Sequence, residues 1–151
     1  MNGPPFSQES TLLAIWYMAT AVVAGCNGPS QVVALEDASQ FETEVLQASH
    51  SQPVLMDFFK EGCAACIALE PTIDKLSNEY AGRVTVMRYP LMSFIFIPHS
   101  AELRRQHDVV LYPTVVLFVD GVEYKRWVAD YSIEHYRQAL DPLVAPPSPA
   151  E

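Results

Sequence analysis

Between residues 32 and 144 the chain alternates apolar runs with amphipathic segments, a pattern that predicts strands and helices in turn. Alternating apolar residues are typical of strands, and a continuous apolar run is typical of a strand buried on both faces. The pair Asp120-Gly121 between two such runs is a strong turn signal for a β-hairpin. The predicted strands are VVALE (32–36), PVLMDFF (53–59), RVTVMRY (83–89) and the hairpin arms 113–119 and 122–128.

Apolar residues at helical spacing predict the helices that follow these strands. They cover residues 39–49, 63–80, 100–107 and a last segment that begins at Ser132. Ser39 and Glu42 have the spacing of a capping box, and Ser100 is the expected cap of the third helix. The order β-α-β-α-β-α-β-β-α predicts an α/β fold, with a central mixed sheet of about five strands flanked on both faces by about four helices.

The N-terminal segment has a different pattern. An uncharged apolar run from Leu12 to Gly25 is shorter than the ~20 residues of a membrane-spanning helix. It has the length of a signal-peptide core and ends in small residues. The sequence Val23-Ala24-Gly25-Cys26 is similar to the lipobox of bacterial lipoproteins, in which the cysteine carries lipid and becomes the first mature residue. Residues 1–10 contain no Lys or Arg, so an uncleaved anchor or a mis-assigned start codon stays open.

These patterns divide the chain into four parts. We expect a signal peptide over residues 1–25, a tether over 26–31, a domain over 32–144 and a disordered Pro-rich tail over 145–151. Export would place the domain on the periplasmic or cell-surface side of a bacterial membrane, held there by a lipid on Cys26.

Composition and charge narrow the functions of the domain. A chain of 151 residues that is half apolar is long enough for one domain with a substantial core. The formal net charge is −9 and no basic cluster is present in the sequence, which argues against nucleic-acid binding through phosphate neutralisation. If Cys26 carries lipid, the remaining cysteines, Cys63 and Cys66, form a matched pair.

This pair can be a redox couple, a metal clip or incidental. A cysteine in the first turn of a helix faces unpaired backbone N–H groups and the positive end of the helix dipole. Both favour the thiolate, so we expect the pKa of Cys63 to fall below the value of about 8.5 for a free thiol. Cys66 lies one turn further on and is more shielded. Such asymmetry suits thiol–disulfide exchange, in which an exposed thiolate attacks and a second thiol resolves the mixed disulfide.

Several separated motifs give the chain a resemblance to the thioredoxin family over about residues 32 to 144. They are VLMDFFKEGCAAC, Pro71 five residues after the second cysteine, YPT (112–114) and LFVDG (117–121). The resemblance implies a thioredoxin-like fold with Cys63 as the nucleophile and Cys66 as the resolving cysteine. It also implies that the protein acts through its redox-active disulfide alone and needs no cofactor and no metal.

The resemblance implies supporting roles for three residues near the pair. Asp57 occupies the place of the family's buried aspartate, where burial would raise its pKa. It could then accept the proton of Cys66 through water. Arg88 stands where many members have a lysine, and could hold this carboxylate charged or orient it. Pro71 maps to the proline that kinks the active-site helix.

A second set of residues is implied to contact the substrate. Pro113 maps to the family's cis-proline and would present the backbone of Tyr112 to an extended substrate. Thr114 and Gly62 complete the expected substrate-binding set. Ala129 stands where the family has a glycine beside the substrate groove.

The chain also departs from the family pattern. Gly62 replaces the aromatic residue before the first cysteine, and Ala64-Ala65 replace Gly-Pro between the cysteines, so the redox potential does not follow from the resemblance. Ala-Ala offers no charge to stabilise the thiolate, which favours a reductant. About six residues are inserted within 89–100, and their apolar side chains either pack on the sheet edge or dock to a partner or the membrane. These side chains are Leu91, Met92, Phe94, Ile95, Phe96 and Ile97.

The resulting prediction is a lipid-anchored, extracytoplasmic protein disulfide reductase. We expect it to act on protein disulfides as a monomer, and to receive electrons from a membrane-embedded thiol donor because the sequence has no flavin or nicotinamide motif.

Two alternatives stay open. One is copper(I) binding by the two soft thiolates, although Glu61 stands where copper domains with this motif typically have a methionine. The other is a thioredoxin-fold binding module with incidental cysteines. The histidines have no metal-ligand spacing and are expected at the surface; they are His50, His99, His107 and His135.

Overall fold

The computed structural model describes residues 29–95 and 99–144. The predicted signal peptide, its lipobox Cys26 and the tail 145–151 lie outside the described residues, as do Phe96 and Ile97. Within the described ranges, no helix combines the length and the apolar character needed to cross a membrane.

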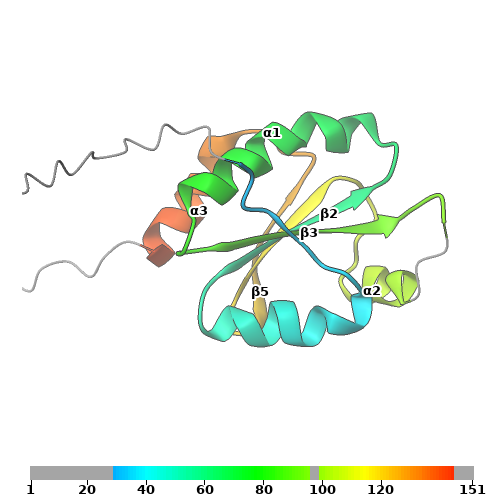
Figure 1. Ribbon diagram of the computed structural model, residues 1–151, viewed down its shortest axis with the longest axis horizontal. Coiled ribbons are helices and arrows are strands. Elements are labelled where there is room, and N and C mark those ends of the chain that lie inside the picture. The colour runs from blue at the N-terminus through cyan, green and yellow to red at the C-terminus, as the bar shows by residue number, and fades with distance from the viewer. Residues whose placement is uncertain (1–28, 96–98, 145–151) are drawn as a thin grey trace, which may run out of the picture.

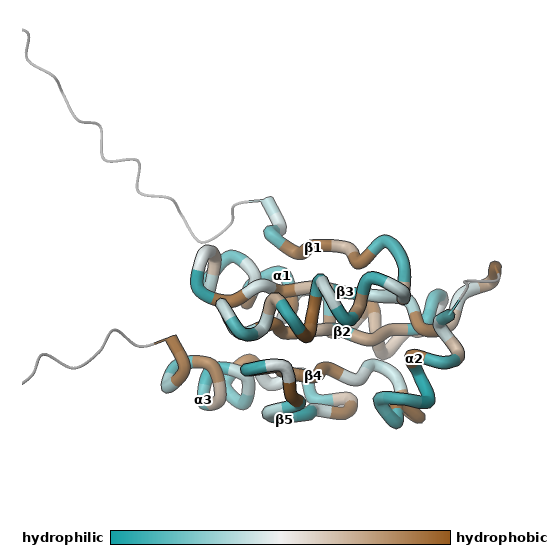
Figure 2. The backbone as a smooth tube through the Cα atoms, turned by 90° about the horizontal axis from the view of Figure 1, so that it is seen from below, coloured by the Kyte–Doolittle hydropathy of each residue, from teal (hydrophilic) through white to brown (hydrophobic). Residues whose placement is uncertain are grey.

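Five strands form one mixed sheet, which confirms the predicted fold class. The strand order is β1-β3-β2-β4-β5, and Figure 2 shows the strands stacked in this order. The pairs β1–β3 and β2–β3 are parallel, whereas β2–β4 and β4–β5 are antiparallel. The strands are β1 (Val33–Ala34), β2 (Val54–Lys60), β3 (Thr85–Met92), β4 (Thr114–Val119) and β5 (Val122–Val128).

Helices cover both faces of this sheet (Figure 1). The helices α1 and α3 lie on one face, and the helical segment 38–50 and α2 lie on the other. The segment 38–50 consists of three consecutive short helical elements. The helical elements are η1 (Ala38–Gln40), η2 (Glu42–Gln47), η3 (Ala48–His50), α1 (Ala64–Glu79), α2 (Ser100–Gln106) and α3 (Ile133–Val144).

Strand β2 lies at the centre of the sheet and separates two hydrophobic cores. Because side chains alternate along a strand, Met56 and Phe58 enter the core under segment 38–50 and α2. Leu55 enters the core under α1 and α3. The continuous apolar run in the sequence is therefore a strand buried on both faces, as predicted. Asp57 follows the same alternation and faces α1, where it is the charged residue of an otherwise apolar run.

The predicted cap of the first helix is wrong by two residues. Asp37 is the N-cap: its carboxylate accepts a hydrogen bond from the N–H of Ser39 (2.7 Å), and Gln40 reaches back to the N–H of Asp37 (3.1 Å). Ser39 and Glu42 have a compatible spacing but do not form the box. The physical reason is that the chain already turns into the helix at Ala38, which leaves Ser39 inside it.

Two expectations for the region around α2 are also wrong. His99, with a φ of 64°, is the N-cap of α2, and Ser100 is buried with its hydroxyl 2.9 Å from that of Tyr89. His107 is half-buried and not fully exposed: the centroid of its ring lies 4.6 Å from that of Phe41 and 5.7 Å from that of Phe118. This burial lowers the pKa of His107. The hydrogen bond between Ser100 and Tyr89 and the aromatic packing around His107 are tertiary contacts, which sequence spacing does not report.

The insertion is divided between strand and loop. Strand β3 continues to Met92 rather than ending at residue 89, and Leu91 is buried in the core beneath α2. Beyond the strand, Phe94 and Ile95 are 85% and 75% exposed. Leu91 therefore packs into the sheet, whereas the next apolar side chains face solvent.

Candidate active site

The end of β2 leads directly into a tight turn that delivers Cys63 to the start of α1. The N–H of Cys63 bonds to the carbonyl of Lys60 (3.3 Å), and the N–H of Glu61 bonds to the carbonyl of Met92 in the neighbouring strand (2.9 Å). Gly62 has a φ of 70°, a conformation that favours glycine. The turn is thus tied to both β2 and β3 before the helix begins.

Cys63 is the N-cap of α1 and is joined by a disulfide to Cys66, with their Cα atoms 5.3 Å apart. The N–H of Cys66 donates to Cys63 Sγ (3.2 Å), and the N–H of Ile67 donates to the carbonyl of Cys63 (3.1 Å). Cys66 is only 3% exposed, whereas Cys63 is partly exposed. The geometry therefore has the predicted asymmetry, with an accessible sulfur at the positive helix end and a shielded one behind it.

Asp57 lies beneath this helix and is 2% exposed. Burial raises the pKa of Asp57 to about 7; Arg88 opposes this rise and Glu70 adds to it. Oδ1 of Asp57 is buried without a hydrogen-bond partner among the described residues. A carboxyl group with a pKa near neutral and a free oxygen can exchange a proton under the conditions in which thiols react.

Arg88 is the cation that faces Asp57 from the adjacent strand. The two residues are register partners in the β2–β3 pair, and Nη2 of Arg88 lies 3.4 Å from Oδ2 of Asp57. The same nitrogen lies 3.1 Å from Oε1 of Glu70 on α1. The guanidinium also lies over the ring of Phe59, 4.4 Å from its centroid. Arg88 thus links the strand to the helix and is not a freely solvated residue.

The loop before β4 reaches the same edge of the sheet. The bond Tyr112–Pro113 is cis, and Thr114 is the register partner of Phe58, so this loop flanks the end of β2. The hydroxyl of Thr114 donates to the carbonyl of Leu111 (2.7 Å), and the carbonyl of Pro113 accepts from the N–H of Ala129 (3.0 Å). Buried Thr114 therefore shapes the loop from within.

The structure brings most of the expected site residues to one edge of the sheet. Pro71 is the one that stands apart, because it lies two turns into α1, on the exposed side. Glu70, which pairs with Arg88, was missed from the sequence, because a helix–strand contact places it and no local pattern signals it. Phe94 was expected only as one of several apolar side chains of the segment 89–100, and the structure places it against Gly62.

Comparison with known proteins agrees with this site. Residues 31–141 match the thioredoxin family. The thioredoxin of Peptoclostridium acidaminophilum is 28% identical over 109 residues, 72% of this chain and 89% of the relative. The thioredoxin of Mycobacterium tuberculosis (strain ATCC 25618 / H37Rv) is 34% identical over 99 residues, 66% of this chain and 78% of the relative. The thioredoxin of Mycolicibacterium smegmatis is 33% identical over the same length, 82% of the relative.

The fold and the cysteine pair define a thiol–disulfide oxidoreductase. The chain belongs to the thioredoxin family.

We expect Asp57→Asn to stabilise the oxidised protein at pH 8 far more than at pH 4. The pKa of Asp57 is about 7 in the folded protein and about 4 in an unfolded chain. The folded state therefore loses stability as the pH rises between these values, by at most about 4 kcal/mol, and the loss is complete above pH 7. Urea unfolding of both proteins at both pH values measures the difference; equal changes at pH 4 and pH 8 would contradict it.

A second expectation concerns Ala129, which has a left-handed φ of 48° beside Pro113. Ala129→Gly relieves this strain and should raise the free energy of unfolding by about 0.5 kcal/mol. The matched control is Ala68→Gly on the exposed side of α1, which should lower it by about 1 kcal/mol. Thermal unfolding measures both, and a destabilised Ala129→Gly would refute the strain argument.

Proposed function

We propose that this protein is a membrane-anchored protein disulfide reductase that works outside the cytoplasm. The observation that carries the catalytic part is the pairing of an accessible Cys63 at the start of α1 with a buried Cys66, above a carboxyl group whose pKa is about 7. The family relationship supports the same chemistry. The described form, with its Cys63–Cys66 disulfide, corresponds to the enzyme after it has reduced a substrate.

In the first half of the reaction the Cys63 thiolate attacks one sulfur of a substrate disulfide. A bond forms between Cys63 Sγ and that sulfur, the substrate disulfide breaks, and its other sulfur leaves as a thiolate that takes a proton from water. The N–H of Cys66, which points at Cys63 Sγ, and the helix dipole would stabilise the attacking thiolate.

In the second half Cys66 resolves the mixed disulfide. Cys66 transfers its proton, through water, to the carboxylate of Asp57, and its thiolate attacks Cys63 Sγ. The Cys63–Cys66 disulfide forms, the bond to the substrate breaks, and the second substrate sulfur leaves and is protonated. Two electrons have then passed to the substrate. Arg88, held by Glu70, keeps the Asp57 carboxylate available as a base near neutral pH.

Substrate binding would use the two backbone segments that flank Cys63. The loop at Pro113 presents the backbone of Tyr112 to an extended substrate segment, and Gly62, against which the ring of Phe94 packs, borders the other side of the sulfur. Thr114 holds this loop in shape through its bond to Leu111. The substrates would be proteins with accessible disulfides, bound by a monomeric enzyme.

The direction of electron flow follows from the residues between the cysteines. Ala64 and Ala65 bring no charge that would strongly stabilise the reduced form, so the pair favours reduction of substrates over their oxidation. The disulfide would be reduced again by a dithiol in the membrane, which becomes a disulfide in turn. The cysteine pair would need no other cofactor.

The place where the chain enters the domain supports anchoring at the N-terminal end. Within the predicted tether, Ser30 and Gln31 bond to Asp74 and Ser77 on α1, at 2.8 Å and 3.1 Å. Asp74 lies eleven positions after Cys63, which is about 17 Å along a helix. An anchor that precedes Ser30 would leave the Cys63 edge of the sheet free for substrates and for the membrane donor.

The exchange mechanism gives different expectations for the two cysteines. Cys63→Ser should abolish reduction of insulin disulfides, because it removes the attacking thiolate. Cys66→Ser should still attack but should accumulate mixed disulfides, visible by mass spectrometry as adducts that dithiothreitol releases. Cys26→Ser is the matched control and should retain turnover. Full turnover by the Cys63→Ser protein would contradict the exchange mechanism, and absence of reduction by the wild type would favour a binding module with incidental cysteines.

The anchoring proposal depends on Cys26 and is tested separately from catalysis. In a bacterial host fed with a labelled fatty acid, the full chain should take up label and sediment with membranes. Cys26→Ser should lose both properties while its insulin reductase activity is kept. Label on the Cys26→Ser protein, or none on the wild type, would reject lipidation without touching the exchange mechanism.

A further inference from the structure

Exposed apolar side chains concentrate around the turn that carries Cys63. Eleven large hydrophobic residues of the described ranges are exposed, and six of these belong to the segments next to Cys63 and Pro113. The other five are spread over β1, β5 and the segment that follows β5. The six residues are Ile67, Met92, Phe94, Ile95, Val110 and Leu111.

Strand register explains why these segments meet. Lys60 at the end of β2 pairs with Met92 at the end of β3, and Phe58 pairs with Thr114 at the start of β4. The loop after β3 and the loop before β4 therefore flank the end of β2, from which the chain turns to Cys63. An apolar surface of this kind at a reactive sulfur is suited to an apolar protein segment.

Phe94 lies against the turn that carries Cys63. A Cβ atom built on Gly62 would lie 2.7 Å from Cζ of Phe94, so the aromatic ring lies against the backbone of Gly62. Gly62 directly precedes Cys63, and neighbouring Cα atoms are about 3.8 Å apart. The ring is nevertheless 85% exposed. It packs one edge on the turn and offers its remaining surface to whatever approaches the sulfur.

Hydrogen bonds to Glu61 hold Phe94 in this place. The Glu61 carboxylate accepts from the hydroxyl of Ser93 and from the N–H of Phe94 (3.1 Å), while the N–H of Glu61 donates to the carbonyl of Met92 (2.9 Å). The hydrogen bonds from Ser93 and Phe94 lower the pKa of Glu61, so the carboxylate is ionised and accepts them strongly. An ordered aromatic ring loses less entropy on binding than a mobile one.

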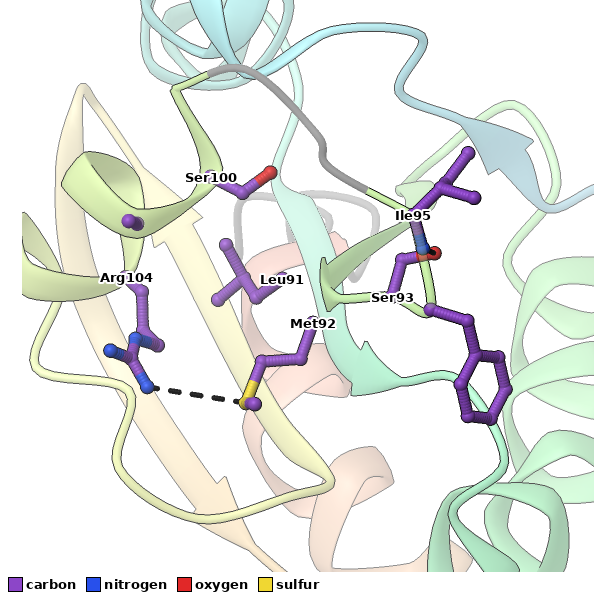
Figure 3. Close-up of a pocket in the computed structure, with 8 residues that line it drawn as sticks. Leu91, Met92, Ser93, Ile95, Ser100 and Arg104 are labelled. Carbon is purple, nitrogen blue, oxygen red and sulfur yellow. Dashed lines mark hydrogen bonds between the residues drawn. The ribbon is translucent and has the colours of Figure 1, made fainter.

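The loop that carries Phe94 also faces α2. It borders a hollow of about 410 Å³ between the end of β3 and α2. In Figure 3 Met92 and Arg104 face each other across this hollow, with the Met92 sulfur 4.0 Å from Nη1 of Arg104. This contact ties the base of the loop to α2 and leaves Phe94 as the exposed aromatic side chain beside Gly62.

We propose that Phe94 is a specificity-determining residue that binds an apolar side chain next to the reactive cysteine of a protein substrate. The inference rests on the proposed disulfide exchange at Cys63. Once the substrate sulfur is bonded to Cys63, the residue next to the substrate cysteine, whose Cα atom is about 3.8 Å from that of the cysteine, would approach the ring of Phe94 beside Gly62. The loop that carries Phe94 would thereby select disulfides flanked by apolar residues over those flanked by polar ones.

Two disulfide peptides that differ at one residue test this selection. One peptide has a leucine before its cysteine, and the other has a serine at that position. Hydroxyethyl disulfide is the third substrate and has no flanking residue. With the full chain in its reduced form, kcat/KM for the leucine peptide should exceed that for the serine peptide about tenfold. Phe94→Ser should remove this preference and leave the hydroxyethyl disulfide rate unchanged, whereas Phe94→Leu should keep most of the preference.

A matched control is Tyr124→Ser, which removes an exposed aromatic residue of β5, an edge strand of the sheet. It should change none of the three rates. Equal rates of the wild type on both peptides, or an equal preference in Phe94→Ser, would overturn the inference while exchange continues. If the wild type reduces neither peptide nor hydroxyethyl disulfide, the proposed function itself is refuted. Reduced partition of Phe94→Ser into phosphatidylcholine–phosphatidylglycerol vesicles, with peptide rates unchanged, would assign the ring to the membrane and overturn the inference.

Discussion

The burial of β2 on both faces is the constraint on which the rest of the structure depends. Its side chains alternate between two hydrophobic cores, so a shift of one residue would move every apolar side chain into the wrong core. The same register sets Asp57 opposite Arg88 and places Phe58 beside Thr114. The end of the strand then directs Cys63 to the start of α1. The register of β2 that packs the two cores therefore also sets the geometry of the active site.

This constraint explains how a carboxyl group comes to be buried on the face of the sheet that α1 covers. Asp57 takes a position that the alternation of β2 makes a core position, and desolvation raises its pKa to about 7. Attraction to Arg88 opposes that rise in pKa, whereas repulsion from Glu70 adds to it. Burial of Asp57 costs folding free energy above neutral pH, and in exchange the site gains a group that can take up a proton near neutral pH.

The inserted loop adds a feature that the central strands alone do not provide. Strand β3 extends through Leu91, whose burial anchors the insertion in the core under α2. After Leu91 the chain continues to Ser93 and Phe94, which both donate hydrogen bonds to the Glu61 carboxylate. The turn that carries Cys63 therefore holds the exposed ring of Phe94 in place. The loop and the reactive turn thus support each other. A change in either one alters the exposed surface beside Cys63.

The sequence by itself determined the strands, the helices and the chemistry of the cysteine pair, because each depends on local order along the chain. The apolar run of β2, the Asp-Gly hairpin and the spacing of Cys63 and Cys66 are patterns of neighbours, and they held in the structure. Only the tertiary structure decided the partners of Arg88, the burial of His107 and the position of Phe94 beside Gly62. These contacts join segments far apart in sequence, and their energies come from packing and register, which no local pattern encodes.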